Sequence, residues 1–288
     1  MPTSRIAFAT FAKLPELTLD DQIAVAALAT RGVEAVPLIW DDPEVAWADF
    51  DAVLLRSTWD YHHKVDSFTA WLDRLDALGV PLWNPPDIVR WNMDKFYLSD
   101  LLELGFAVTP SVWLPRGAQV QLAALLDEKG WADVVVKPTI SAAADNTQRV
   151  MRGALDGAQA DLEKLLSASG VVVQPLMKAV QTQGEWSLMF FGKQYSHAVL
   201  KKPAVGDFRV QEHLGGSLAA GEPPPGLIEQ ASEILEQVND PLPYARVDGV
   251  EQDGRLVLME LELIEPALFF GYAKGAAERF AEVLMELL

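Results

Sequence analysis

The sequence predicts a mixed α/β fold, with parallel α/β structure in its first third and an α+β arrangement in the C-terminal part. Short apolar runs alternate with amphipathic segments over residues 1–90, as in βαβ units. Later apolar runs are separated by short Gly-containing turns, which is typical of hairpins. A chain of 288 residues can form more than one core, and we expect one domain over residues 1–90 and a second over 91–288.

The N-terminal domain is predicted to hold a parallel sheet covered by helices. Its expected strands are 6–11, 33–40, 52–56 and a short 81–84, and its expected helices are 19–31 and 67–78. Ligands of such sheets bind beyond the carboxyl ends of the strands. One of these ends carries Arg56, Ser57 and Asp60, which are therefore candidates for substrate binding. The alternative is a polar loop around one buried Trp.

Two prolines at 85–86 predict a linker, after which a helix is expected over residues 92–104 with Lys95 in its first turn. A helix start favours an acid over a lysine. Lys95 is therefore either simply solvated or adds charge to an anion site at that helix start. The next strand, 133–137, ends at Lys137, and a small polar loop follows at 139–147.

The rest of the chain alternates less regularly. We expect helices at 120–129 and 157–168, a strand at 171–175, a hairpin of 186–191 with 194–200, a helix ending near 238 and a final helix from 273.

A second hairpin over residues 246–262 concentrates charge, and its turn decides which side chains meet. A two-residue Asp-Gly loop would place Asp248 and Glu260 on opposite faces of the sheet. A three-residue loop with a left-handed Gly254 and a bulge would instead pair Asp248 with Leu258. We expect the three-residue loop.

With that loop, Arg246 pairs with Glu260, and three carboxylates share one face: Asp248, Glu260 and Glu262. Crowded carboxylates raise one another's pKa unless a cation lies between them. The face has two interpretations, a Mg²⁺ site built from oxygen ligands and a solvated face of a sheet.

Composition excludes several classes of protein. A net charge of −18 argues against nucleic-acid and anionic-membrane binding, and the absence of cysteine excludes disulfides and zinc–thiolate sites. No apolar stretch is long enough for a transmembrane helix, and residues 6–12 are better read as a strand than as a signal peptide. We expect a cytoplasmic protein that binds a small amino-acid-like molecule. The oligomeric state is open, a homodimer included.

Standard site motifs are absent. The chain has no P-loop, dinucleotide fingerprint, nucleophile elbow or His-Glu-x-x-His motif. The histidines show no metal-ligand spacing in the sequence: His62, His63, His197 and His213.

An ordered set of residues nevertheless resembles the ATP-grasp superfamily, most closely the branch of ribosomal-protein glutamate ligase and glutathione synthetase. The set comprises Lys95, Lys137, residues 174–177, Glu185, Arg209 followed by His213 and Gly215-Gly216, and Asp248 followed by Glu260 and Glu262. The resemblance covers roughly residues 90–270. It implies a first nucleotide-binding lobe at 91–175 and a second lobe at 176–288 that carries the metal site.

The resemblance also implies a role for each residue. Lys95 and Lys137 would hold the ATP phosphates, and Glu185 would accept hydrogen bonds from the ribose. Adenine would meet the strand end Gln174, Pro175, Leu176 and Met177. Arg209 and Arg246, as catalytic residues, and Lys201 would face the phosphates and the developing charge. Asp248, Glu260 and Glu262 would bind Mg²⁺. The implied function is an ATP- and Mg²⁺-dependent carboxylate–amine ligase that acts through an acyl phosphate.

Three features depart from the ligase pattern. Glu262 stands where Asn is usual, Pro266 comes one residue late, and the loop 141–146 is rich in Ala rather than Gly. Together with the run 56–61, these features resemble a smaller subgroup that includes a cyclo-ligase making D-cycloserine from O-ureido-D-serine. The alternatives are an ATP-grasp kinase of small molecules and a non-catalytic nucleotide-binding protein.

Overall fold

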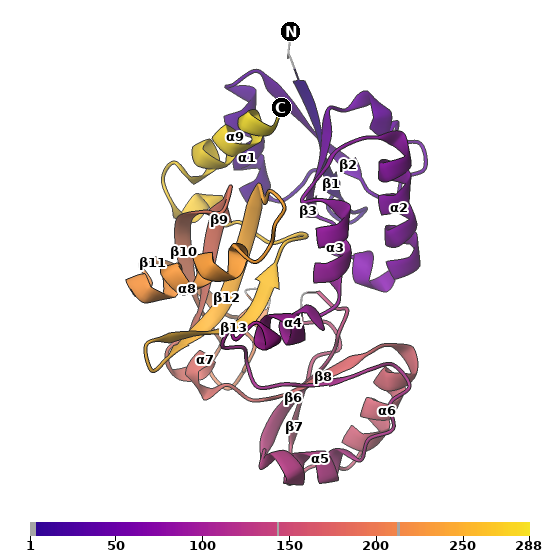
Figure 1. The fold of residues 1–288 in the computed structure, drawn as a ribbon, viewed down its shortest axis with the longest axis vertical. Coiled ribbons are helices and arrows are strands. Elements are labelled where there is room, and N and C mark those ends of the chain that lie inside the picture. Colours follow the sequence, from indigo (N-terminus) through magenta and orange to yellow (C-terminus); the bar gives the residue numbers. More distant parts are fainter. Residues whose placement is uncertain (1–3, 143, 212–213) are drawn as a thin grey trace.

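The computed structural model describes residues 4–142, 144–211 and 214–288. Three sheets follow one another along the long axis of the molecule (Figure 1). The N-terminal α/β part lies at one end, a five-stranded antiparallel sheet in the middle and a small α/β lobe at the other end. The mixed α/β prediction is confirmed.

The first sheet is parallel, as predicted, and has the strand order β2-β1-β3-β4. Its strands are β1 (Ser4–Thr10), β2 (Val33–Ile39), β3 (Ala52–Ser57) and β4 (Leu82–Trp83), with helices α1 (Leu19–Ala29) and α2 (Val65–Leu78) and short 3₁₀ turns η1 (Trp47–Asp49) and η2 (Tyr61–His63). The Thr18 side chain caps α1 by accepting the Asp21 N–H. Gly79, with φ +67°, ends α2 in the left-handed conformation.

The region after the first sheet differs from the prediction. Helix α3 (Pro86–Met93) begins directly at the prolines, so this segment is not a linker. Asp94 has extended backbone and separates α3 from α4 (Tyr97–Glu103). The single helix expected over 92–104 is therefore wrong, and Lys95 lies in the connection between two helices.

The small lobe holds an antiparallel sheet with the order β5-β8-β6-β7. Its elements are β5 (Val112–Leu114), α5 (Leu122–Lys129), β6 (Asp133–Pro138), β7 (Gln148–Met151), α6 (Ala158–Ala168) and β8 (Val171–Pro175). Leucines of both helices share one apolar cluster with valines of the strands. This cluster covers one face of the small sheet.

The middle sheet is antiparallel with the order β11-β10-β9-β12-β13. Its elements are α7 (Lys178–Thr182), β9 (Glu185–Phe191), β10 (Gln194–Lys202), β11 (Ser217–Gly221), α8 (Pro225–Leu235), β12 (Tyr244–Gln252) and β13 (Arg255–Glu262). Helix α8 covers one face through a cluster that includes Leu227, Ile234 and Leu258. The opposite face of β12 and β13 is left for polar groups.

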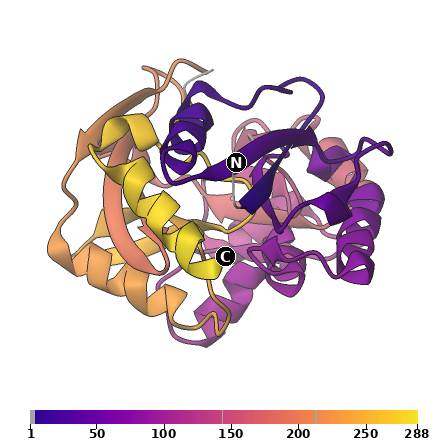
Figure 2. The ribbon, with the colours of Figure 1, turned by 90° about the horizontal axis from the view of Figure 1, so that it is seen from above.

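The chain ends by returning to its beginning. After the 3₁₀ turn η4 (Phe270–Tyr272), helix α9 (Ala276–Leu287) lies beside α1, as Figure 2 shows for the yellow and indigo helices. Phe280 and Leu284 of α9 share a core cluster with Phe8 of β1. Among the helices described, none is long and apolar enough to cross a membrane.

Candidate active site

The turn of the charged hairpin has two residues, because Gln252 pairs directly with Arg255. Asp253 and Gly254 have φ values of 54° and 77°, as a type I′ turn requires. The left-handed Gly254 was predicted correctly, but the three-residue loop was not. An Asp-Gly loop of this type matches the twist of the two strands, so the local sequence favours it.

A bulge in β13 compensates for the short turn. The register shifts between Asp248 and Gly249, so that Asp248 pairs with Glu260 and Arg246 pairs with Glu262. The predicted pairs of Asp248 with Leu258 and of Arg246 with Glu260 are therefore wrong. Because directly opposite residues project to the same side of a sheet, all three carboxylates still share one face.

The bulge depends on a glycine. A Cβ atom added to Gly249 would lie 2.6 Å from the Val257 carbonyl oxygen and 2.7 Å from Leu256 Cδ1. Only glycine allows the two strands to approach this closely.

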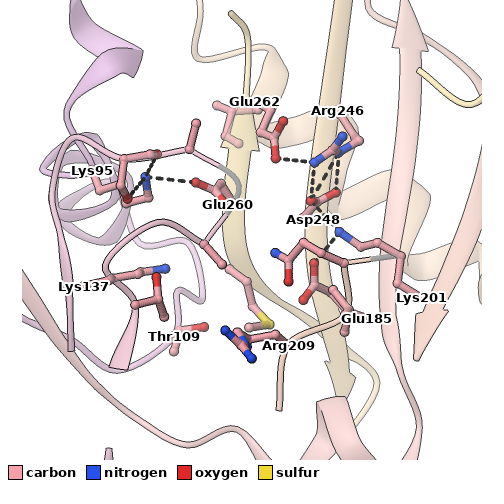
Figure 3. Close-up of a pocket in the computed structure, with 18 of the residues that line it drawn as sticks. Lys95, Thr109, Lys137, Glu185, Lys201, Arg209, Arg246, Asp248, Glu260 and Glu262 are labelled. Carbon is pink, nitrogen blue, oxygen red and sulfur yellow. Dashed lines mark hydrogen bonds and ion pairs between the residues drawn. The ribbon is translucent and has the colours of Figure 1, made fainter. Parts of the chain in front are cut away.

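The charged face opens into a cavity of about 430 Å³ to which residues from all three sheets or their adjoining loops contribute (Figure 3). Of the predicted site residues, the cavity is lined by Lys95, Lys137, Gln174, Pro175, Leu176, Met177, Glu185, Lys201, Arg209, Arg246, Asp248, Glu260 and Glu262. The fold thus brings together segments that lie far apart in the sequence.

Figure 3 shows Lys95 and Lys137 on the same side of Glu260, away from Asp248. The Lys95 ammonium donates to the Ser141 carbonyl at 2.7 Å and lies 3.3 Å from a Glu260 carboxylate oxygen. The backbone of Lys137 belongs to the ladder of β6 with β8, but its side-chain ammonium has no hydrogen-bond or ion-pair partner among the described residues. Burial lowers the Lys137 pKa, since desolvation disfavours the ammonium form. An anion in the cavity would restore the missing partner.

On the opposite side, Asp248 is the centre of a buried ionic network. Its carboxylate accepts hydrogen bonds from Ser187 at 2.6 Å, Lys201 at 2.8 Å and Arg246 at 3.0 Å. Burial alone raises the Asp248 pKa, but Arg246 and Lys201 outweigh it and lower the pKa to about 2. Asp248 is therefore ionised and already saturated with donors.

The other two carboxylates are more available. Burial raises the Glu262 pKa, and the nearby Asp248 and Glu260 add to this, giving a value of about 7 although Arg246 forms an ion pair with Glu262. Burial also acts to raise the Glu260 pKa, but Lys95 and Lys137 reverse the effect and the net pKa is lowered. The side chains of Glu260 and Glu262 are 33% and 26% exposed.

These donors fit Mg²⁺ only in part. Glu260 and Glu262 present oxygen atoms to the cavity, and Mg²⁺ commonly takes one or two protein carboxylates beside phosphate and water oxygens. Asp248 differs, because Ser187, Lys201 and Arg246 occupy its oxygens. In the described part of the chain, Asp248, Glu260 and Glu262 do not form a set of three converging ligand atoms.

At the other end of the cavity, the tip of β8 brings residues 174–177 to its wall. Gln174 is held by a 2.8 Å hydrogen bond from its amide to Ser111. Glu185 forms a 2.6 Å ion pair with Lys201, and the Arg209 guanidinium pairs with Asp207 at 3.0 Å. Both Lys201 and Arg209 thus have internal carboxylate partners. His213 lies outside the described residues.

The structure does not bring the predicted substrate residues into the cavity. Arg56 is 1% exposed and pairs with Asp21 at 2.9 Å. Ser57 is fully buried against Thr10, and Asp60 accepts from Trp40 and Lys64.

These three assignments are therefore corrected. A buried arginine needs a carboxylate partner and backbone acceptors. Arg56 finds its partner in α1 and also donates to the Pro266 carbonyl at 2.9 Å. Ligands of parallel sheets bind beyond the carboxyl ends of the strands. This rule locates the edge of the sheet that faces the ligand, but it does not predict which side chains at that edge point away from it.

Four further residues that line the cavity were not among the predicted site residues. Trp59, Tyr61, Phe269 and Glu265 line it. The Trp59 indole donates to the Glu265 backbone carbonyl at 3.1 Å. Burial raises the pKa of the Glu265 side chain well above its ordinary value, and the negative charge of the nearby Glu262 adds to this effect. A signal was present, because Glu265 lies between apolar residues only three positions after Glu262.

The fold and this cavity define the class of protein: an ATP-grasp ligase, an enzyme that uses ATP to form a C–N bond. A family model described as the N-terminal domain of D-cycloserine synthetase DcsG matches residues 6–84. The chain is 32% identical over 279 residues to the cycloserine biosynthesis protein DcsG of Streptomyces lavendulae, and 91% of each chain is covered. The chain therefore belongs to the DcsG family.

Solved structures agree with this assignment. The crystal structure of D-cycloserine synthetase DcsG superposes with a TM-score of 0.89 at 30% identity, covering 98% of this chain and 99% of that one. The ATP-grasp ligase PsnB, in a complex with Mg, ADP and a variant of its minimal precursor, gives a TM-score of 0.68 at 20% identity and covers 99% of each chain. At that identity the second likeness shows the fold alone. Use of ATP and Mg²⁺ is a general property of ligases with this fold.

Proposed function

We propose that this chain is a cyclo-ligase that uses ATP and Mg²⁺ to close an amide ring within one amino-acid-like molecule. The observation that carries the proposal is the position of Lys137. Its ammonium has no partner in the described part of the chain, and it lines the same cavity as Glu260. A cation without a partner suits a phosphate, and a neighbouring carboxylate suits the metal that accompanies it.

In this proposal, the nucleotide lies along the tip of β8. Residues 174–177 would meet adenine, Glu185 would accept from the ribose, and Lys95 and Lys137 would hold phosphate oxygens. Lys201 and Arg209 line the same cavity and add positive charge near the phosphates. Phosphoryl transfer is accelerated mainly by alignment and by charge neutralisation, which these groups supply.

Glu260 and Glu262 would hold Mg²⁺ directly, and the metal would neutralise charge on the transferred phosphoryl group. Asp248 would act one step away, since it fixes Arg246 and Lys201 by ion pairs at 3.0 and 2.8 Å. Arg246 would face the developing charge from this fixed position. The assignment keeps all three predicted acids in the metal region but gives them unequal roles.

The substrate would occupy the end of the cavity at Trp59, Phe269 and Glu265. A carboxylate such as Glu265 can receive a substrate ammonium group, and that charge would lower the raised Glu265 pKa. These residues would take the substrate-binding role that was predicted for Arg56, Ser57 and Asp60. The side chains of those three residues instead contact Asp21, Thr10 and Trp40.

The proposed reaction has two bond exchanges. A substrate carboxylate oxygen attacks the γ-phosphorus, the bond to ADP breaks, and an acyl phosphate results. A nitrogen of the same molecule then attacks the acyl carbon, phosphate leaves, and the nitrogen loses a proton. Holding both ends in one cavity makes the second step intramolecular, which removes much of its entropic barrier.

The D-cycloserine synthetase relative points to D-cycloserine as the product, and the resemblance to the cyclo-ligase subgroup implies O-ureido-D-serine as the substrate. Because the D-cycloserine ring carries no carbamoyl group, water must also cleave the bond between that group and the ureido nitrogen, which keeps a proton, and the group leaves as carbamic acid, which breaks down to CO2 and ammonia.

The test is to incubate the protein with ATP, Mg²⁺ and O-ureido-D-serine, and to measure ADP, phosphate and the small-molecule products by mass spectrometry. We expect substrate-dependent ADP and phosphate together with D-cycloserine. A stable phosphorylated substrate would instead identify a kinase. ATP binding without turnover on this or related D-amino acids would contradict an enzymatic function.

A further inference from the structure

A cluster outside the active-site cavity combines two histidines and an acid. His62 and His63 belong to η2, which follows β3, whereas Asp145 comes from the loop between β6 and β7. Each of the three residues offers one atom that could bind a metal ion, and these three atoms all lie within 4.8 Å of one another. Among the described residues, no other set of three or more His, Cys, Asp or Glu side chains meets this condition. No spacing in the sequence indicated it.

Distances within the cluster suit a metal better than direct hydrogen bonds. His62 Nε2 lies 3.6 Å from Asp145 Oδ2, and His63 Nδ1 lies 3.9 Å from the same oxygen. Both separations exceed a normal hydrogen bond. Two ligands bound at about 2.0–2.1 Å to a tetrahedral Zn²⁺ lie about 3.3–3.4 Å apart. A small inward shift of the side chains would therefore complete the geometry.

His62 provides a second and independent observation. Its side chain is only 6% exposed, yet both ring nitrogens are buried without a hydrogen-bond partner among the described residues. A buried polar atom without a partner has lost its hydrogen bonds to water without replacement, which destabilises the fold. An unprotonated imidazole nitrogen offers a lone pair to a metal ion, so a bound metal would supply the partner that His62 lacks.

We propose that His62, His63 and Asp145 form a Zn²⁺-class metal site that fastens the loop after β6 to the N-terminal domain. Two imidazoles and one carboxylate suit Zn²⁺ and neighbouring transition metals, whereas Mg²⁺ prefers oxygen ligands alone. The site is therefore chemically distinct from the metal region at Glu260. A second cavity, of about 750 Å³, is lined by all three residues and leads to them.

The position of the loop gives such a site a consequence for the enzyme. Ser141, Ala142, Ala144 and Thr147 of the same loop line the active-site cavity, and the Ser141 carbonyl accepts from the catalytic-site Lys95. A metal bound through Asp145 would hold this loop in its place beside the phosphate region. Bound Zn²⁺ would then stabilise the loop without touching the nucleotide.

Calorimetric titration of Zn²⁺ into untagged, nucleotide-free protein, with millimolar Mg²⁺ present throughout, tests the site. We expect one Zn²⁺ per chain in the wild type and an affinity lower by about tenfold or more in His63→Ala and in Asp145→Asn. Both side chains are exposed enough to be replaced without disturbing a core. Asp161→Asn, which changes an exposed acid on α6, should bind as the wild type does.

Hydrogen exchange of residues 139–147, with and without Zn²⁺, tests the tether. We expect Zn²⁺ to slow exchange in the wild type and to leave Asp145→Asn unchanged. Zn²⁺ binding that is absent from the wild type, equal in all variants, or without effect on exchange would overturn the proposal. None of these measurements involves turnover, so they are independent of the cyclo-ligase assignment.

Discussion

At the scale of single residues, the active site is organised by the pairing of buried charges. Arg246 and Lys201 neutralise Asp248, and Lys95 lies beside Glu260. A buried charge is tolerated when it is paired and hydrogen-bonded. The Lys137 ammonium has no such partner among the described residues, so its charge is free to meet a ligand.

Replacing Lys137 by Ala should therefore weaken ATP binding by about 10- to 100-fold, the loss of one charge-assisted contact to phosphate. The dissociation constant can be measured by calorimetry. Lys129→Ala is a suitable control, because Lys129 lies at the surface end of α5 beside Glu128. An unchanged affinity in the Lys137 variant would remove Lys137 from the phosphate site.

Glu260→Gln should lower kcat by about 100-fold or more while leaving the fold intact, because the amide cannot neutralise Mg²⁺. Steady-state kinetics over a range of Mg²⁺ concentrations and a circular dichroism spectrum check both parts. Glu286→Gln, in an exposed position of α9, controls for the loss of one negative charge. Near-normal turnover of the Glu260 variant would refute the metal assignment.

At the scale of elements, the hairpin of β12 and β13 decides whether the acids can act together. A type I′ turn sets one register, and the bulge then shifts it by one residue. Since side chains alternate along a strand, a shift of one residue moves a side chain to the other face. The shared acidic face therefore depends on backbone geometry at Gly249 as much as on the acids.

Gly249→Ala should lower the free energy of unfolding by about 1–3 kcal/mol, because the new Cβ meets the Val257 carbonyl. It should also weaken Mg²⁺-dependent turnover, since the strands must separate. Gly153→Ala is the matched control: it adds the same methyl where no atom lies within 4 Å. Chemical denaturation measures both, and equal stability of the two variants would show that the bulge tolerates a side chain.

At the scale of the whole molecule, the C-terminal segment joins the middle sheet to the N-terminal domain. His197 of β10 is 7% exposed, and its Nε2 donates to the carbonyls of Leu268 and Phe269 at 3.0 and 3.1 Å. Beyond these residues, Phe280 reaches the core cluster of β1 and α1. A domain boundary was predicted at residue 90. In the structure, β1 and α1 from before this boundary share one core with the C-terminal helix α9.

This junction should be sensitive to acid. Burial lowers the His197 pKa from 6.5 to about 4, so the folded protein binds this proton less readily than the unfolded chain. The corresponding stability is present above pH 6.5 and is lost as the pH falls towards 4, by about 3 kcal/mol in total.

We expect His197→Gln, which cannot take up the proton, to lose correspondingly less stability over this interval. The comparison requires denaturation curves of both proteins from pH 7 to pH 4. Parallel pH profiles for the two proteins would show that His197 is not the sensitive group.

The sequence by itself determined most of the strands and helices and most of the charged residues that line the cavity, but it did not indicate β5, β7 or β11. Local signals carry this information: Thr18 caps a helix, Gly79 ends one, and the order of Lys95, Lys137, Glu185 and Glu260 resembles the ATP-grasp pattern. Each of these signals acts through neighbouring residues or through fixed spacing.

Only the tertiary structure decided how the side chains are used. Arg56 turned inward because Asp21 offers a partner from another element, and Asp248 is saturated by donors from three strands. The bulge at Gly249 and the meeting of His62 with Asp145 are likewise set by packing between distant segments. Burial and partner choice depend on the whole fold, and no local pattern encodes them.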